Sequence, residues 1–211
     1  MSRLGKVLAA QYKNMMENPS PHLLVYLDEA DIRIWYFLIC GLDKPFQLGE
    51  YIFKLTAPDD FPQKPPSCEF YTANGVFEPG GPICISIGEF HADDFHATAH
   101  GAYGWRASLG MKGFAMQVVN GMICNDSLGS GIRIQKTTVL EKTTLALQSR
   151  SKNMRSLSNM YRTFESFITA NPENLAVKTI LAQRGPPAAP PAAAPPAAAP
   201  VTWDDLLSMI E

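Results

Sequence analysis

Cys84 is the residue of this chain best placed for covalent chemistry. It lies between Ile83 and Ile85, directly after residues 75–82, which are rich in glycine and proline. Such a run forms neither a helix nor a central strand, so we expect irregular backbone packed against another element. A cysteine among isoleucines is more often a small buried hydrophobe. A thiol beside such a loop can nevertheless be a reaction centre, and Asn74 offers it an amide N–H donor.

Three of the chain's four histidines, His91, His96 and His100, follow within one stretch that also holds two aspartates. Histidine and aspartate are metal ligands, but this spacing places the three rings on no single helical face. Gly101 and Gly104 indicate a loop. We therefore predict a polar flap over the groove of the thiol, with no bound metal and no cofactor.

The composition is that of one domain with a tail. The chain has 211 residues, 46% of them hydrophobic, and a net charge of −2, which gives no indication of nucleic-acid binding. Its four cysteines are far apart, which argues against a zinc site or a disulfide framework and favours a reducing compartment, cytoplasmic or nuclear. No apolar signal segment and no run of roughly 18 apolar residues is present, so we expect no membrane anchor.

The elements that position Cys84 are predicted from periodicity and from turn residues. An amphipathic helix comes first, with Ser2 as its N-cap, and an apolar segment after the cysteine predicts a buried central helix. Asn171 and Pro172 predict the start of a last short helix. The full order is a helix at 2–17, strands at 23–27, 32–40, 50–57 and 67–71, and helices at 105–123, 138–152, 156–170 and 171–184. This order indicates an α+β fold.

Three cations of the first helix, Arg3, Lys6 and Lys13, lie opposite its apolar side. A solvated surface is the simpler interpretation of such a cluster. The functional interpretation is a docking face for an acidic partner.

The C-terminal residues differ in composition from the rest of the chain. Residues 186–200 contain only proline and alanine, and they predict a semi-rigid spacer with a reach of about 50 Å. Residues 201–211 predict a short acidic amphipathic helix, whose apolar side is formed by Trp203, Leu206, Leu207 and Ile210. Such a peptide is expected to dock on an unknown partner protein or to fold back onto its own domain.

The order of elements and several short motifs resemble the ubiquitin-conjugating enzyme family over residues 3–170. The spacing of ten residues from Asn74 to Cys84 also fits that family. The closest branch is the endoplasmic-reticulum-associated one, which is normally tail-anchored, whereas this chain shows no anchor. The residues that carry the resemblance are Glu17-Asn-Pro-Ser-Pro21, Lys64-Pro-Pro66, Thr72-Ala-Asn-Gly75, Pro82-Ile-Cys-Ile-Ser86, Phe90-His91 and Leu128-Gly-Ser-Gly131.

The resemblance implies a ubiquitin-conjugating fold: an N-terminal helix, a four-stranded antiparallel meander, a central helix and C-terminal helices. It implies that Cys84 accepts ubiquitin from the ubiquitin-activating enzyme as a thioester and passes it to a protein substrate. Asn74 is implied either to donate its amide to the oxyanion or to pin its loop. The resemblance further implies a gate or general base among Ser86, His91 and Asp126, and contacts with the activating enzyme or a ligase at Arg3, Lys6, Lys13, Pro62 and Gln63.

Three residues depart from the family pattern, namely Gln63, Ala73 and Arg106, so the ligase is left open. One alternative is therefore an inactive variant that acts as a ubiquitin-binding scaffold. Others are a cysteine hydrolase that uses one of the three clustered histidines, and an adaptor that acts through its C-terminal peptide. The expected organisation is a core domain at 1–170, a short helix at 171–184, a Pro/Ala-rich linker at 185–200 and a docking peptide at 201–211.

Overall fold

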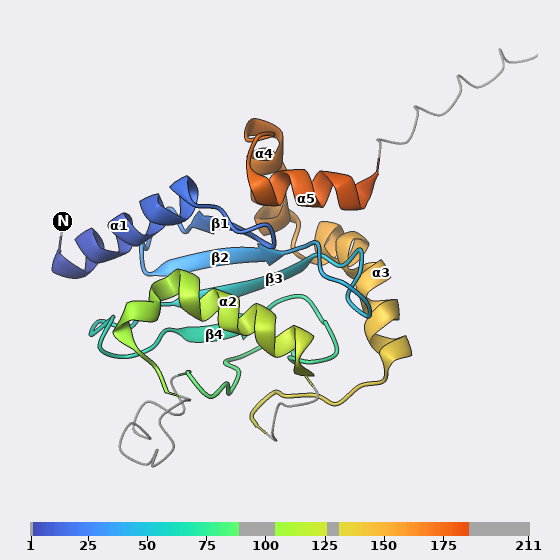
Figure 1. Cartoon of the computed structure of the whole chain (residues 1–211), viewed down its shortest axis with the longest axis horizontal. Helices are drawn as coiled ribbons and strands as arrows, with labels where there is room; N and C mark the ends of the chain where they lie inside the picture. Colours follow the sequence, from blue (N-terminus) through green and yellow to red (C-terminus); the bar gives the residue numbers. More distant parts are fainter. Residues whose placement is uncertain (1, 89–103, 126–130, 186–211) are drawn as a thin grey trace, which may run out of the picture.

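The computed structural model describes residues 2–88, 104–125 and 131–185 of the chain (Figure 1). The first element is helix α1 (Arg3–Glu17), which begins where the Ser2 hydroxyl accepts a hydrogen bond from the backbone N–H of Gly5 at 3.0 Å. That bond satisfies one of the unpaired donors of the first turn. Leu8 and Met15 are buried on its inner side, as the periodicity predicts.

Four strands form one antiparallel sheet in the order β1-β2-β3-β4. Their bounds are β1 Leu23–Leu27, β2 Ile34–Ile39, β3 Tyr51–Thr56 and β4 Ser67–Phe70. Neighbours in sequence are neighbours in the sheet, so the predicted meander is confirmed. The strands are one to three residues shorter than predicted, except β1, whose bounds agree.

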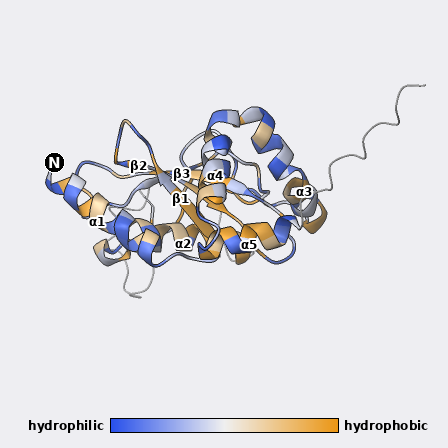
Figure 2. Ribbon diagram, turned by 90° about the horizontal axis from the view of Figure 1, so that it is seen from above, coloured by the Kyte–Doolittle hydropathy of each residue, from blue (hydrophilic) through white to orange (hydrophobic). Residues whose placement is uncertain are grey.

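The two faces of the sheet bury two separate sets of apolar side chains, because successive residues of a strand point to opposite faces. Trp35, Phe37 and Phe53 lie in the larger cluster, with residues of α1 and α2 (Gly110–Ile123). Leu38 and Ile52 lie in the second cluster, with residues of α4 (Ser158–Ala170) and α5 (Leu175–Arg184). Figure 1 shows α4 and α5 grouped away from α2. Figure 2 shows the hydrophobic colours concentrated on the strands between them.

The helical half begins with a short 3-10 turn, Ala107–Leu109, which leads into α2. Helix α3 (Val139–Ser156) starts with a capping box, in which Thr138 and Glu141 bond each other's backbone N–H. The predicted start of the last helix at Asn171 is wrong. Asn171 ends α4, and Asn174 caps α5 by accepting from the N–H of Ala176 at 2.9 Å. Both are asparagines, and the sequence pattern did not separate them.

Among the helices of the described residues, none has both the length and the apolar character needed to cross a membrane. The α+β architecture predicted from the sequence, with a central helix and C-terminal helices after the meander, is confirmed in these residues.

Candidate active site

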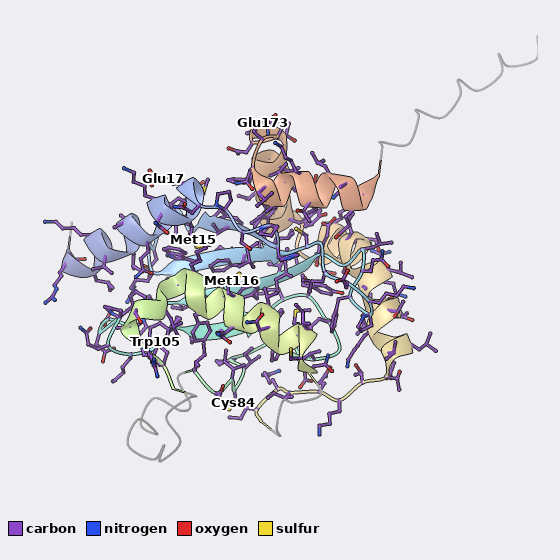
Figure 3. All side chains as sticks on the ribbon, in the orientation of Figure 1. Met15, Glu17, Cys84, Trp105, Met116 and Glu173 are labelled. Carbon is purple, nitrogen blue, oxygen red and sulfur yellow. The ribbon has the colours of Figure 1, made fainter. Side chains whose placement is uncertain are left out.

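Cys84 lies in irregular backbone between β4 and the chain that leads into α3. Its backbone N–H donates to the carbonyl of Ile132 at 3.0 Å, and the N–H of Ile83 donates to Cys68 on β4 at 2.9 Å. Ile83 and Ile85 are buried, whereas the thiol residue itself is half-buried. In Figure 3 Cys84 lies among the loops below the sheet, far from α4 and α5. The backbone is thus fixed on both sides while the cysteine retains partial access to solvent.

Gly131 brings a neighbouring chain close to the cysteine. A Cβ at this position would come within 3.4 Å of the Cys84 Cβ and within 2.9 Å of the Ile134 side chain. A larger residue would therefore push either the cysteine segment or Ile134 aside. This close approach explains physically why glycine suits position 131.

The side chain of Asn74 is fully buried and holds its own loop together. Its Oδ1 accepts from the backbone N–H groups of Val76 at 2.9 Å and Phe77 at 2.8 Å. Its Nδ2 donates to the carbonyl of Thr72 at 3.2 Å, a bond that uses one of the two amide protons. The predicted alternative of loop pinning therefore has direct geometric support.

The same loop is braced from the start of α3. The Thr137 hydroxyl donates to the carbonyl of Gly75 at 2.6 Å, and Gly75 has a φ of +81°, a conformation that glycine adopts without strain. The buried Lys142 donates to the Asn125 side chain at 2.5 Å. These contacts tie the Asn74 loop, α3 and the end of α2 into one unit beside the cysteine segment.

Three of the five predicted enzyme-docking residues meet in one place. Arg3, Pro62 and Gln63 line a shared cavity of about 330 Å³ between the start of α1 and the turn that joins β3 to β4. Lys6 and Lys13 are exposed on α1, where Lys13 lies 3.7 Å from Glu17. The indole of Trp105 holds this turn by donating to the Pro62 carbonyl at 2.9 Å, a contact that no local sequence pattern indicates.

Other predicted site residues lie outside the described part of the chain. These are His91, His96, His100, Asp126, and the four apolar residues of the C-terminal peptide, Trp203, Leu206, Leu207 and Ile210. Ser86 is described and is exposed, two residues beyond Cys84. Within residues 2–88, 104–125 and 131–185, no group of three or more His, Cys, Asp or Glu side chains is arranged to hold a metal ion.

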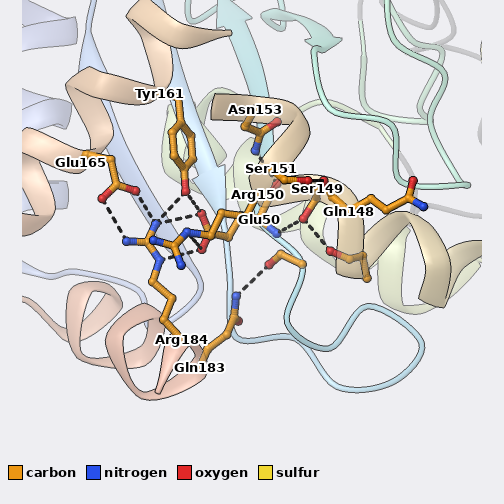
Figure 4. Close-up of polar contacts among 12 residues, drawn as sticks. Glu50, Gln148, Ser149, Arg150, Ser151, Asn153, Tyr161, Glu165, Gln183 and Arg184 are labelled. Carbon is orange, nitrogen blue, oxygen red and sulfur yellow. Dashed lines mark hydrogen bonds and ion pairs between the residues drawn. The ribbon is translucent and has the colours of Figure 1, made fainter. Parts of the chain in front are cut away.

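A second buried polar region surrounds Glu50, which precedes β3 and is 1% exposed (Figure 4). Arg184, at the end of α5, donates to its two carboxylate oxygens at 2.7 and 2.9 Å and also to Glu165 at 2.6 Å. The Tyr161 hydroxyl donates to the same carboxylate. No local pattern in the sequence indicates this network, because its two main partners, Glu50 and Arg184, are 134 positions apart.

The backbone of Glu50 is held as closely as its side chain. Its N–H donates to the Ser149 hydroxyl at 2.9 Å, and its carbonyl accepts from Asn153 at 2.8 Å. Burial opposes the charge of Arg184, but the carboxylates of Glu50 and Glu165 raise the pKa of Arg184 above its usual value. Burial, together with Glu50, raises the pKa of the Tyr161 hydroxyl. The network therefore keeps Arg184 charged and the Tyr161 phenol neutral at neutral pH.

Comparisons with known proteins agree on one family. The family model described as "Ubiquitin-conjugating enzyme" matches residues 7–151. A "Ubiquitin-conjugating enzyme E2 6" of Candida glabrata is 30% identical over 167 residues, which are 79% of this chain and 63% of that protein. Its namesake in Saccharomyces cerevisiae is 32% identical over 81% of this chain and 63% of its own length. The "Ubiquitin-conjugating enzyme E2 J2" of Homo sapiens is 29% identical over 70% and 52%.

The matched region thus spans about 63% of the length of the first of these relatives. Among solved structures, the human ubiquitin-conjugating enzyme E2 G1 aligns with a TM-score of 0.47 at 24% identity, over 58% of this chain and 96% of that one. The matched family region contains both Asn74 and Cys84 and ends within α3.

Proposed function

The chain belongs to the ubiquitin-conjugating enzyme family, and we propose that it accepts ubiquitin as a thioester on Cys84 and transfers it to a protein substrate. The observation that carries this proposal is the setting of Cys84. Its backbone is fixed to β4 and to Ile132, and its thiol is half-buried on irregular chain rather than sealed in the core.

The reaction is an exchange of one thioester for another. The Cys84 thiolate attacks the carbonyl carbon that joins the ubiquitin C-terminus to the cysteine of the activating enzyme. A new C–S bond forms, the old C–S bond breaks, and the released thiolate takes up a proton. Because both bonds are thioesters the exchange is nearly balanced, and a thiol is already a few per cent thiolate at neutral pH. No base adjacent to Cys84 is therefore needed for this step.

In the transfer step, a nucleophile of the substrate protein attacks the thioester carbonyl carbon on Cys84. This attack places negative charge on the oxygen of that carbonyl. Asn74 is the proposed donor for that oxygen, through the amide proton that does not bond Thr72. The assignment of Ser86, His91 and Asp126 as gate or general base remains a prediction. The surface around Arg3, Pro62 and Gln63 is the proposed contact for the activating enzyme, because helix and turn residues meet there in one cavity.

A charging assay tests the proposal. The purified chain is mixed with activating enzyme, ATP and ubiquitin, and the products are separated on gels with and without a reducing thiol. We expect a thiol-sensitive adduct that is absent in Cys84→Ala and becomes a thiol-resistant ester in Cys84→Ser. Cys124→Ser is the matched control, because Cys124 is an exposed cysteine and should be dispensable.

One outcome would favour the second candidate, an inactive ubiquitin-binding scaffold. That outcome is a chain that is folded and binds ubiquitin but forms no adduct with ubiquitin or with any ubiquitin-like modifier tried with its own activating enzyme. An adduct that persists in Cys84→Ala would contradict the assignment of the cysteine.

A further inference from the structure

Helix α3 buries the polar side of its surface. Its buried residues are Lys142, Ala146, Ser149 and Asn153, three of which are polar or charged. Each of these three has a partner: Lys142 bonds Asn125, Ser149 bonds Glu50, and Asn153 bonds both Glu50 and Thr72. This side is therefore satisfied against the domain and is not available to another ligand.

The opposite side of α3 presents large apolar residues to solvent. Leu140, Leu147 and Met154 are 75%, 62% and 56% exposed. They are seven residues apart, so they fall on one side of the helix. We call these three residues the α3 stripe. A helix of a folded domain normally turns its apolar side inward, and a row of exposed apolar residues usually marks an interaction surface.

The flanks of the α3 stripe are basic in its C-terminal half. Arg150 and Arg155 are exposed there, Arg150 while also approaching Glu50 at 3.9 Å, and Glu141 near the start is the only acidic residue of the helix. An occupant that suits this surface combines a short apolar row with negative charge.

We propose that the α3 stripe is the docking site of this chain's own C-terminal segment, residues 201–211. The segment carries Trp203, Leu206, Leu207 and Ile210 at the spacing of one helical side. Its charged residues are Asp204, Asp205 and Glu211, and it contains no lysine or arginine. Apolar pattern and charge are thus complementary to the α3 stripe and to its basic flanks.

The tether to this segment begins beside α3. Arg184, the last residue of α5, lies 2.7 Å from the Glu50 carboxylate oxygen that Arg150 of α3 approaches at 3.9 Å. Figure 4 shows both arginines converging on this carboxylate. An 18-residue helix is about 27 Å long, whereas the spacer that follows Arg184 reaches about 50 Å. The segment can therefore reach any part of α3.

Tethering also makes a weak contact sufficient. A connection that can span the two sites makes docking an intramolecular event, so the docked state can be populated even where the separate peptide binds poorly. The proposal resolves the two alternatives for the C-terminal peptide in favour of its own domain. It does not depend on ubiquitin transfer, and its test contains no ubiquitin.

The test uses fluorine NMR of the full chain labelled with 5-fluorotryptophan. The chain has three tryptophans, and Trp35 and Trp105 are buried in the core, so they report on folding while Trp203 reports on docking. The Trp203→Phe variant assigns its resonance. We expect the Trp203 resonance of the wild-type chain to differ from that of the isolated peptide 201–211. We expect it to move to the peptide position in the triple variant Leu140→Glu, Leu147→Glu, Met154→Glu.

A matched control places the same three charges on other exposed apolar residues, through Ile123→Glu, Leu175→Glu and Leu181→Glu. This control should leave the Trp203 resonance displaced. A second variant, Leu206→Glu with Leu207→Glu, disrupts the segment rather than α3, so the test stands even if the α3 variant does not fold.

Three outcomes would overturn the proposal. The first is a Trp203 resonance at the peptide position in the wild-type chain. The second is a displacement that disappears on dilution, which indicates docking between two copies. The third outcome has two parts: the Trp203 resonance lies at the peptide position in solution, and the wild-type chain cosediments with phosphatidylserine vesicles whereas the α3 variant does not. That result would assign the α3 stripe to a membrane.

Discussion

Two buried polar regions of this molecule are held in different ways. Around Glu50, which precedes β3, side chains of α4 and α5 meet in one network, and Tyr161 and Arg184 both lie more than 100 residues from Glu50 in the sequence. Around Asn74, neutral groups bond the backbone only two or three residues away. The first region joins distant elements of the fold. The second shapes one loop beside a half-buried thiol.

This difference predicts that the Glu50 region mainly determines the stability of the fold, whereas the Asn74 region mainly affects the reaction at Cys84. A buried charge that loses its partner is costly, so the Glu50 network is expected to control the folding of the helical half. A local loop held by neutral bonds contributes less to folding, but it sets the backbone next to Cys84. Damage to the two regions should therefore appear in different measurements.

The largest expected effect is that of Arg184→Met. This change leaves the Glu50 carboxylate buried without its main cation, so we expect the free energy of unfolding to fall by about 3–5 kcal/mol, as measured by urea denaturation. Lys178→Met is the control on the same helix, since its ion pair with Glu173 is exposed and should contribute little to stability. Equal losses in the two variants would contradict the central role of the Glu50 network.

Two substitutions of Asn74 distinguish its contribution to stability from its contribution to ubiquitin transfer. Asn74→Ala removes the acceptor of two backbone N–H groups, so we expect a loss of about 2–3 kcal/mol in unfolding free energy. Asn74→Asp keeps that acceptor, but it buries a carboxylate and turns an oxygen towards the Thr72 carbonyl, so we expect it to lose stability as well. It also lacks the amide donor, and in its folded fraction the discharge of ubiquitin from Cys84 should slow about 100-fold.

The measurement is single-turnover discharge onto free lysine, corrected for the folded fraction of each variant. Wild-type discharge by Asn74→Asp would reduce the role of Asn74 to holding its loop.

The smallest expected effect concerns pH on the Glu50 side. Burial, and to a lesser degree Glu50, raise the pKa of Cys40 from 9.0 to about 12. The folded state thus binds the thiol proton more tightly than the unfolded state does, so this stability is complete below pH 9 and is lost as the pH rises towards 12. For this one proton, the free energy of unfolding falls by at most about 1.4 kcal/mol per pH unit.

Urea denaturation at a series of pH values from 8 to 10 checks this expectation. The series stops at pH 10 because that is the ordinary pKa of tyrosine. Cys40→Ala should flatten the decline above pH 9, whereas Cys124→Ala, on the exposed end of α2, should not. A decline that is identical in the wild-type chain and in Cys40→Ala would argue that this thiol stays protonated in both states.

Much of the fold could be predicted from the sequence because its signals are local. Alternation of apolar residues located the strands, and Ser2 marked the start of the first helix. The family and its endoplasmic-reticulum-associated branch were predicted from motifs around Asn74 and Cys84, and this prediction is confirmed by the family model and by the E2 6 and E2 J2 relatives.

What the sequence did not reveal depends on distant pairs. Arg184 looks like an ordinary basic residue at a helix end, and Glu50 looks like a polar residue before a strand. The exposure of Leu147 and Met154 could not be foreseen either, because α3 has apolar residues around much of its circumference and only its packing decides which side is buried. The roles of Cys84 and Asn74 remain predictions that the geometry supports.

The most direct test of the account is intact-mass spectrometry of the wild-type chain after incubation with activating enzyme, ATP and ubiquitin. We predict one added ubiquitin with the loss of one water, released by a reducing thiol and mapped to the peptide that contains Cys84. The absence of an added mass on a folded chain, or an adduct mapped to Cys124, would contradict the account.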